Sequence, residues 1–284
     1  MTCAFCPGHV TCFFHPVRTG DPETTGSRGA GLRLSAGTQV IVEERTDRRV
    51  RIVMDGSETD APVSRKVIDM TCPDRGLDVT ITNDLPVGQG FGMSASGAIA
   101  LALALCALTG RDPGEAYRYA HVAEVVGGGG LGDVAAIASN RDQPVRIRPG
   151  LPPVGEVVGT GIRFERLTLA VIGDRLSTGP IIADPGMQRL MNEVGSRMVD
   201  DYVSSPSPDS LFAKAREFSS SVGLESPDVR AALGKMDGVA PAGMCMLGHS
   251  IFTTLPEDDA KEILGDVPVY SVSTSSAPAL IRRV

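Results

Sequence analysis

The residues whose types and spacing could do chemistry begin with a glycine-rich stretch, Pro86–Ala98, in which glycines at three alternate positions are followed by two serines. Glycine lets a backbone turn with positive φ and lets its N–H groups approach a ligand closely. Residues 95–108 are small or apolar, which predicts a helix that is buried on all sides. A glycine turn entering a helix offers free N–H groups and the positive end of the helix dipole to a phosphate.

Two carboxylates in the next segment could complete such a site. Glu124 stands near the end of a helix predicted over about 113–126, and Asp133 follows four consecutive glycines, 127–130, at the start of another helix. The glycines would let the chain reverse and bring the two acids together. Two adjacent carboxylates are costly unless a cation lies between them or one is protonated, and magnesium on phosphates supplies that charge. Individually, Glu124 also fits an exposed helix position and Asp133 an N-cap.

Three phosphate-binding patterns can be compared with the glycine-rich stretch. The P-loop pattern fails because the stretch contains no lysine. The dinucleotide pattern fits only in its weaker form, Gly90-x-Gly92-x-x-Ala95, and it does not leave a strand directly near the start of a βαβ unit. The pattern P-x-G-x-G-[LF]-G-x-S-[AS]-[AS] fits 86–96 without a gap. The stretch therefore resembles the ATP-binding loop of the GHMP small-molecule kinases.

This resemblance implies that the chain uses ATP and Mg²⁺. In the family, a Glu before a glycine-rich turn takes Mg²⁺, and an Asp that ends the turn faces the substrate hydroxyl. Carried over, Glu124 and Ser94 are the implied metal ligands and Asp133 is the implied catalytic base. The loop residues implied in ATP binding are Pro86, Gly88, Gly90, Gly92, Met93, Ser94, Ala95 and Ser96.

Two segments nearer the N-terminus bear on the substrate. His9 follows Pro7-Gly8, which interrupts a predicted strand; alone, it also fits a satisfied core histidine. Gly26-Ser-Arg-Gly-Ala-Gly31 predicts a tight turn that would hold the guanidinium for bidentate binding of a carboxylate, although a plain turn with a solvated arginine fits too. Both segments resemble the archaeal-type pantoate kinase branch of the family. The resemblance implies substrate contacts from His9, Ser27 and Arg28.

The remaining elements predict two domains, 1–160 and 161–284. In the first, residues 45–76 predict a hairpin and loop, and strands are predicted at 32–43, 77–83, 145–148 and 154–159. In the second, a buried strand at 167–172 precedes helices at about 185–202, 210–222 and 227–235, a strand region at 243–253, a helix at 256–264 and a strand at 267–272. Thr178 and Ser250 are further candidates for the substrate pocket. The resemblance implies an α+β GHMP kinase fold, with a ribosomal protein S5 domain 2-like N-terminal domain and a ferredoxin-like C-terminal domain.

Composition limits the partners. The chain has 284 residues, 42% of them hydrophobic and 21% charged, as in a globular protein. Its net charge of −7 argues against nucleic acid and membrane surfaces, both of which favour a basic face. The six cysteines lack a second pair at zinc spacing and no secretory signal precedes them, which predicts reduced thiols in a cytoplasmic protein. The oligomeric state stays open, a homodimer included.

Together these features predict a kinase for a small hydroxy acid. The resemblance implies ATP-dependent phosphorylation of the primary hydroxyl of pantoate to 4-phosphopantoate, a step towards coenzyme A. Two alternatives remain open: a GHMP kinase for homoserine, shikimate or mevalonate, and a non-catalytic metabolite-binding protein on the same fold. The Gly26–Gly31 segment favours a carboxylate substrate, and the joint presence of Ser94, Glu124 and Asp133 favours catalysis.

Overall fold

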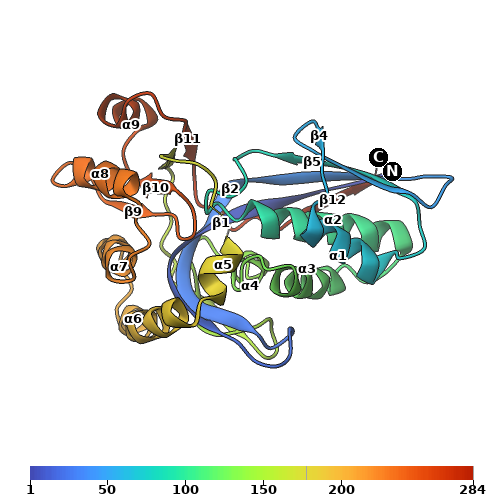
Figure 1. The fold of residues 1–284 in the computed structure, drawn as a ribbon, viewed down its shortest axis with the longest axis horizontal. Coiled ribbons are helices and arrows are strands. Elements are labelled where there is room, and N and C mark those ends of the chain that lie inside the picture. The colour runs from blue at the N-terminus through green and yellow to red at the C-terminus, as the bar shows by residue number, and fades with distance from the viewer. Residues whose placement is uncertain (177, 284) are drawn as a thin grey trace.

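Two β-sheets and the helices packed on them make up the chain. The structure, a computed structural model, describes residues 1–176 and 178–283. In Figure 1 the larger sheet lies on the right and the smaller sheet on the left, and the long strands β1 and β2 curve into the region between them.

The larger sheet is built around two long antiparallel strands, β1 (Thr2–Val17) and β2 (Gly26–Glu44). Its order is β12-β1-β2-β5-β3-β4, and β6 and β7 extend from β2. Only the β3–β5 pair is parallel among the described strands. The other strands are β3 (Val50–Met54), β4 (Ser57–Glu58), β5 (Leu77–Asn83), β6 (Pro144–Arg148), β7 (Glu156–Gly159) and β12 (Leu280–Arg283).

Three helices cover one face of this sheet: α1 (Pro62–Thr71), α2 (Met93–Thr109) and α3 (Glu115–Val126), with the short α4 (Asp133–Ala138) beyond them. The predicted all-apolar helix is confirmed as α2, which is buried along almost its whole length. It lies between the sheet and its neighbours because every side of it is apolar. Its first turn therefore has a fixed position at the edge of the core.

The smaller sheet has the order β11-β8-β10-β9 and is antiparallel. With helices between β8 and β9 and between β10 and β11, this is the βαββαβ arrangement of a ferredoxin-like unit, as predicted. Its elements are β8 (Leu167–Val171), α5 (Thr178–Ala183), α6 (Pro185–Ser204), α7 (Pro208–Ser221), α8 (Pro227–Met236), β9 (Ala242–Met244), β10 (Ser250–Thr253), α9 (Glu257–Leu264) and β11 (Val269–Val272).

The two halves share part of their core. Phe13 of β1 stacks edge-on against Tyr202 of α6, with ring centroids 5.4 Å apart, and Phe14 contacts Phe218 of α7. The chain also returns to the larger sheet at its end, where β12 pairs with β1. We retain the division into residues 1–160 and 161–284 as a proposal.

Three local predictions were wrong. The interruption predicted at Pro7 is a register irregularity within a continuous β1. Residues 26–29 form extended strand rather than a tight turn, because they pair with residues 14–17 of β1. Residues 45–76 contain α1 as well as a hairpin; α1 begins with a proline in its first turn and buries Val67 and Ile68 against α2.

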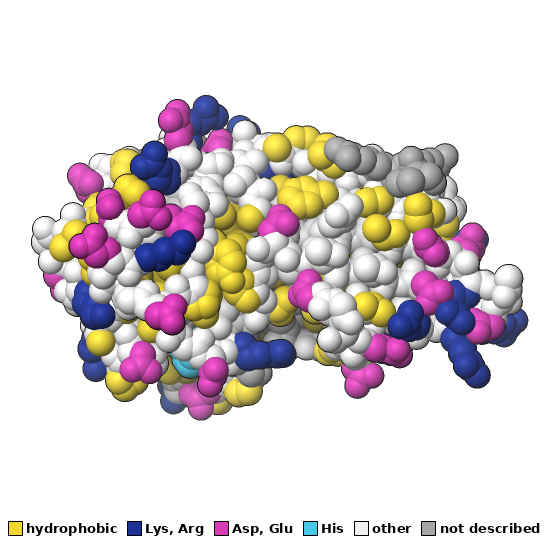
Figure 2. Space-filling model, turned by 90° about the horizontal axis from the view of Figure 1, so that it is seen from above, with side chains coloured by type: hydrophobic (Ala, Val, Ile, Leu, Met, Phe, Trp, Pro, Cys, Tyr) yellow, Lys and Arg dark blue, Asp and Glu magenta, His cyan; other side chains and the backbone are white. Residues whose placement is uncertain are grey.

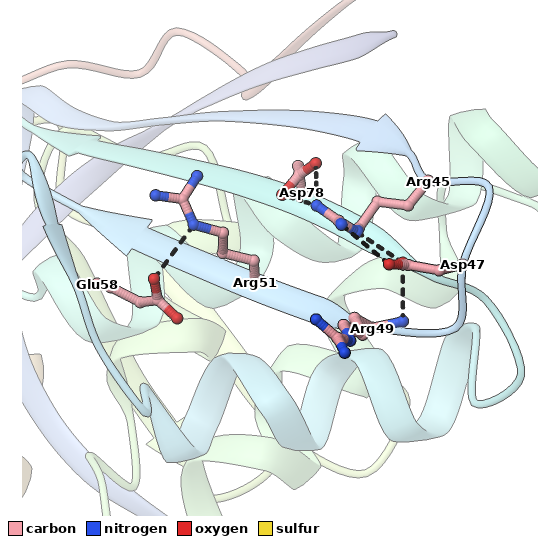
Figure 3. A network of polar contacts seen from close by, with 6 residues as sticks. All are labelled: Arg45, Asp47, Arg49, Arg51, Glu58 and Asp78. Atoms are coloured by element: carbon pink, nitrogen blue, oxygen red, sulfur yellow. Dashed lines mark hydrogen bonds and ion pairs between the residues drawn. The ribbon is translucent and has the colours of Figure 1, made fainter.

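The surface carries mixed charge. Just after the C-terminal end of β2, Arg45 donates to Asp47 and to both oxygens of Asp78. On β3, Arg51 donates to Glu58 (Figure 3). Acidic and basic side chains alternate over the C-terminal half on the face seen in Figure 2. All six cysteines are free and buried. Within residues 1–176 and 178–283, no helix has the length and apolarity needed to cross a membrane.

Candidate active site

A cavity of about 560 Å³ opens where the two halves meet. Its walls are the glycine-rich loop before α2, the glycine turn between α3 and α4, and the segment that leads into α5. Apolar side chains among its lining residues include Pro62, Val63, Val87, Leu176, Ile182, Met246 and Leu247. The charged side chains that line it are Glu124, Asp133, Arg146 and Arg175, among the residues described.

The glycine-rich loop turns into α2 through residues with positive φ. Gly90 has φ 74° and Gly92, the N-cap of α2, has φ 69°. A Cβ at Gly92 would lie 2.7 Å from the His9 carbonyl oxygen, so only glycine lets the loop pack this closely on β1. No side chain caps α2, and its first-turn N–H groups therefore remain available to an anion beside the cavity.

Glu124 and Ser94 form one polar pair in the wall. Ser94 Oγ donates to Glu124 Oε1 at 2.5 Å, and the Gly130 N–H donates to Glu124 Oε2 at 2.7 Å. Burial raises the pKa of the Glu124 carboxyl from 4.5 to about 7, against the two hydrogen bonds, and the nearby Asp133 charge adds to the increase. A cation placed here would stabilise the carboxylate. One carboxylate and one hydroxyl also suit Mg²⁺, which takes its remaining ligands from phosphates and water.

Asp133 forms a second polar centre a short way along the same wall. Its Oδ1 lies 2.8 Å from His9 Nδ1 and accepts a hydrogen bond from Thr11 Oγ1. Burial raises the pKa of the Asp133 carboxyl, but the hydrogen bonds from His9 and Thr11 and the charge of Arg146 outweigh it and hold the pKa below its usual value. A Cβ at Gly130 would lie 2.7 Å from Asp133 Oδ2 and 3.5 Å from Glu124 Oε2. The glycine turn therefore brings the two carboxylates together.

His9 lies behind Asp133 and not on the cavity wall. It is fully buried, and burial lowers the pKa of its imidazole, so the ring is neutral at pH 7 and donates from Nδ1 to the carboxylate. Its Nε2 has no hydrogen-bond partner among the described residues. His9 thus orients Asp133.

Arg146 is a site residue that the sequence did not reveal. It lies on β6, lines the cavity, and is 1% exposed. Its Nε and Nη1 have no hydrogen-bond partner among the described residues, and burial lowers the pKa of the guanidinium. A buried, unpaired guanidinium is costly, and it suits the carboxylate of a ligand, which it can hold with two parallel hydrogen bonds. Ser27 also lines the cavity, and its predicted contact with the substrate stays a prediction.

Arg28, which the sequence nominated for the substrate carboxylate, is placed elsewhere. Successive side chains of a strand point to opposite faces, so Ser27 and Arg28 cannot both face the cavity. The Arg28 guanidinium instead donates to Asp200 Oδ1 of α6 at 2.5 Å and to the Ile147 carbonyl at 2.9 Å. It is absent from the described cavity wall.

The other predicted site residues occupy different places. Residues 88, 90 and 92–95 line the cavity; Pro86 and Ser96 do not. Ser96 is fully buried and donates to the Cys6 carbonyl, which anchors α2 to β1. Ser250 is also buried and donates to the Gln89 carbonyl beneath the glycine-rich loop. Thr178 begins α5, but its side chain lies outside the described structure.

This arrangement places an anion-binding loop, a metal-compatible carboxylate and an ionised aspartate around one cavity. A phosphate on the loop would lie near Glu124, and a hydroxyl at Asp133 would face it. Phosphoryl transfer needs this kind of positioning and electrostatic stabilisation and little covalent chemistry from the protein. Fold and site therefore define a small-molecule kinase.

Comparisons with known proteins agree with this class of protein. Residues 62–141 match the family described as GHMP kinases N terminal domain. The chain is 33% identical over 279 residues to a pantoate kinase from Thermococcus kodakarensis, covering 93% of this chain and 92% of that protein. A solved structure described as a phosphotransferase related to the CoA biosynthesis pathway has a TM-score of 0.89 at 30% identity, covering 99% of this chain and 98% of that one. The chain belongs to the GHMP kinase family.

A more distant structure shows the fold alone. The mevalonate kinase from Methanococcus jannaschii has a TM-score of 0.66 at 13% identity, over 96% of this chain and 98% of that one. The predicted α+β GHMP kinase fold is confirmed.

Proposed function

We propose that this protein transfers the γ-phosphoryl group of ATP to the primary hydroxyl of pantoate, forming 4-phosphopantoate in cytoplasmic coenzyme A biosynthesis. The observation that carries the proposal is that Asp133 and Arg146, whose Nε and Nη1 have no described partner, line one cavity beside the glycine-rich loop. A hydroxy acid presents one group for each. The identity with the pantoate kinase from Thermococcus kodakarensis supports pantoate among such acids.

The nucleotide end of the cavity follows from its lining. The triphosphate would take hydrogen bonds from N–H groups of residues 88–94 and from the open N-terminus of α2. Apolar side chains in the cavity wall, Pro62, Val63 and Val87 among them, would suit the faces of a purine. Mg²⁺ would be held by Glu124 and Ser94, and when bound it neutralises charge on the phosphates.

Charged side chains of the protein, Arg146 and Asp133, would bind the phosphoryl acceptor. Arg146 would hold the pantoate carboxylate in the dry wall of the cavity, which fixes the position of the chain that carries the primary hydroxyl. Asp133 would accept a hydrogen bond from that hydroxyl, orient its oxygen toward the γ-phosphorus and receive its proton as the new bond forms. Because the pKa of Asp133 lies below its usual value, it is a weak base. Orientation is then its larger contribution, consistent with a loose transition state in which the proton leaves late.

His9 keeps Asp133 in that role. The neutral ring donates from Nδ1 and holds the carboxylate in place, so the second oxygen, Oδ2, is left for the substrate.

The proposal is tested by Mg²⁺-dependent ADP release across a panel of acceptors. Pantoate should be used with a kcat/KM far above that for homoserine, mevalonate or shikimate. Turnover of one of the other acceptors but not of pantoate would refute the substrate assignment. ADP release at one rate with every acceptor and with none would refute the kinase assignment.

A further inference from the structure

The glycine-rich loop lacks a cation of its own. Residues 86–96 contain no lysine or arginine, although ATP carries several negative charges into a chain whose net charge is −7. Hydrogen bonds from N–H groups bring only partial positive charge. Mg²⁺ at Glu124 and Ser94 would neutralise part of the phosphate charge, and a cationic side chain from another part of the chain would neutralise more of it.

Among the described residues, two cations line the cavity, Arg146 and Arg175. Arg146 stands on β6 near Asp133, at the acceptor end. Arg175 lies in the turn between β8 and α5, at the glycine-rich loop: a Cβ at Gly88 would lie 2.9 Å from Arg175 Cβ and 3.7 Å from its Cα. The backbone of Arg175 therefore covers the tip of the loop.

Hydrogen bonds on both sides of Arg175 fix this approach. The Leu176 N–H donates to the Gly88 carbonyl at 2.9 Å, and Gln89 Nε2 donates to the Gly173 carbonyl at 2.9 Å. The turn is thus attached to the loop while the Arg175 side chain itself remains exposed.

The Arg175 guanidinium has no described partner, which is also true of exposed arginines such as Arg166, but Arg175 alone among these unpaired arginines lines the cavity within the described residues. Arg45 and Arg51, by contrast, are occupied by carboxylates (Figure 3). No hydrogen bond or ion pair of the Arg175 guanidinium occurs within residues 1–176 and 178–283. It is therefore free to turn onto a ligand without first giving up an ion pair.

We infer that Arg175 binds the phosphates of the nucleotide, supplying from the C-terminal half the charge that the glycine-rich loop lacks. The inference rests on the proposed function only in taking a nucleotide as the ligand. Its planar guanidinium can donate two parallel hydrogen bonds to phosphate oxygens over Gly88. Nucleotide binding would then hold the β8–α5 turn against the loop and join the two halves across the cavity.

The test compares ADP with adenosine, which lacks phosphates, as ligands of the whole protein in a calorimeter. Arg175→Ala should weaken ADP binding roughly tenfold and leave adenosine within about twofold of the wild type. Arg175→Lys should recover part of the loss, because it keeps the charge and loses the planar fork. Arg166→Ala is the matched control, since Arg166 is exposed in the same half and is absent from the cavity wall; it should bind both ligands like the wild type.

Two results would overturn the inference. One is Arg175→Ala binding ADP as the wild type does. The other is an equal loss for ADP and adenosine, which would indicate a disturbed cavity in place of a lost phosphate contact. Because ADP binding needs no acceptor, the result is independent of the acceptor's identity. Failure of the wild type to phosphorylate pantoate would refute the proposed function, and the comparison of ADP with adenosine binding would still test the role of Arg175.

Discussion

A buried, unpaired guanidinium such as that of Arg146 should bind the substrate and also lower the stability of the fold. In Arg146→Met, activity should therefore fall while stability rises. If Arg146 holds the substrate carboxylate, its loss removes charge-assisted hydrogen bonds made inside a nearly closed wall. We expect kcat/KM for pantoate to fall by roughly 10²–10³-fold while the Kd of ADP stays unchanged. Arg148→Met, on the same strand but with its side chain 60% exposed and 3.5 Å from Glu156, should change neither.

Stability should rise in the same variant. In the wild type, two donors of Arg146 are buried without partners, and each such group costs about 1–3 kcal/mol. Methionine fills similar space without them. The lost attraction between Arg146 and Asp133 offsets part of the gain, so we expect a net stabilisation of about 1–2 kcal/mol. This corresponds to a rise in Tm of about 2–6 °C for a chain of this size.

The assays are steady-state kinetics with varied pantoate and thermal unfolding of the ligand-free protein. An unchanged KM and kcat for pantoate would refute the carboxylate role. A Tm that falls by several degrees would show that the guanidinium stabilises the fold, and the argument from its missing partners would then be wrong.

Three further changes test the rest of the site. Asp133→Asn should lower kcat by roughly 10²–10⁴-fold with ADP binding intact, and near-full kcat would exclude the role of base and orienter. His9→Leu should raise the pKa of Asp133, because His9 lowers it in the wild type. The acid limb of the pH profile of kcat/KM should then move to higher pH. An unmoved limb would contradict the hydrogen bond between His9 and Asp133. Glu124 has its pKa raised by burial from 4.5 to about 7, so the folded state binds the proton more tightly and stability falls as pH rises through that range. Urea unfolding in EDTA gives the free energy of unfolding of Glu124→Gln relative to the wild type. This difference should shift in favour of the variant by about 2–3 kcal/mol from pH 4 to pH 8. An equal difference at both pH values would argue against the raised pKa.

The parts of the fold that sequence predicted well are those that local sequence decides. The strand at 77–83 and the apolar helix after the glycine-rich loop are specified by their own residue patterns, and both are confirmed. The four glycines at 127–130 likewise make the reversal that brings Glu124 and Asp133 together.

The failures came from strand pairing, which the local composition does not show. Gly26–Gly29 has the composition of a turn, yet pairing with residues 14–17 at the end of β1 holds it extended, and the strand alternation then turns Arg28 to α6. Arg146 and Arg148 are equivalent in any period-two pattern. A register irregularity between them, in the pairing of β6 with β7, leaves one buried in the cavity wall and the other exposed. Nothing in the sequence distinguished the two.

The central claim is that one cavity positions the primary hydroxyl of a hydroxy acid against the γ-phosphate of ATP. The most direct measurement is proton-coupled ³¹P NMR of the product formed from ATP, Mg²⁺ and pantoate. A phosphomonoester on the primary carbon couples to two protons, so the account predicts a new triplet that grows as ATP is consumed. The doublets of ADP appear in either case. A doublet in the phosphomonoester region, from phosphate on the secondary hydroxyl, or inorganic phosphate as the sole new signal besides ADP, would contradict it.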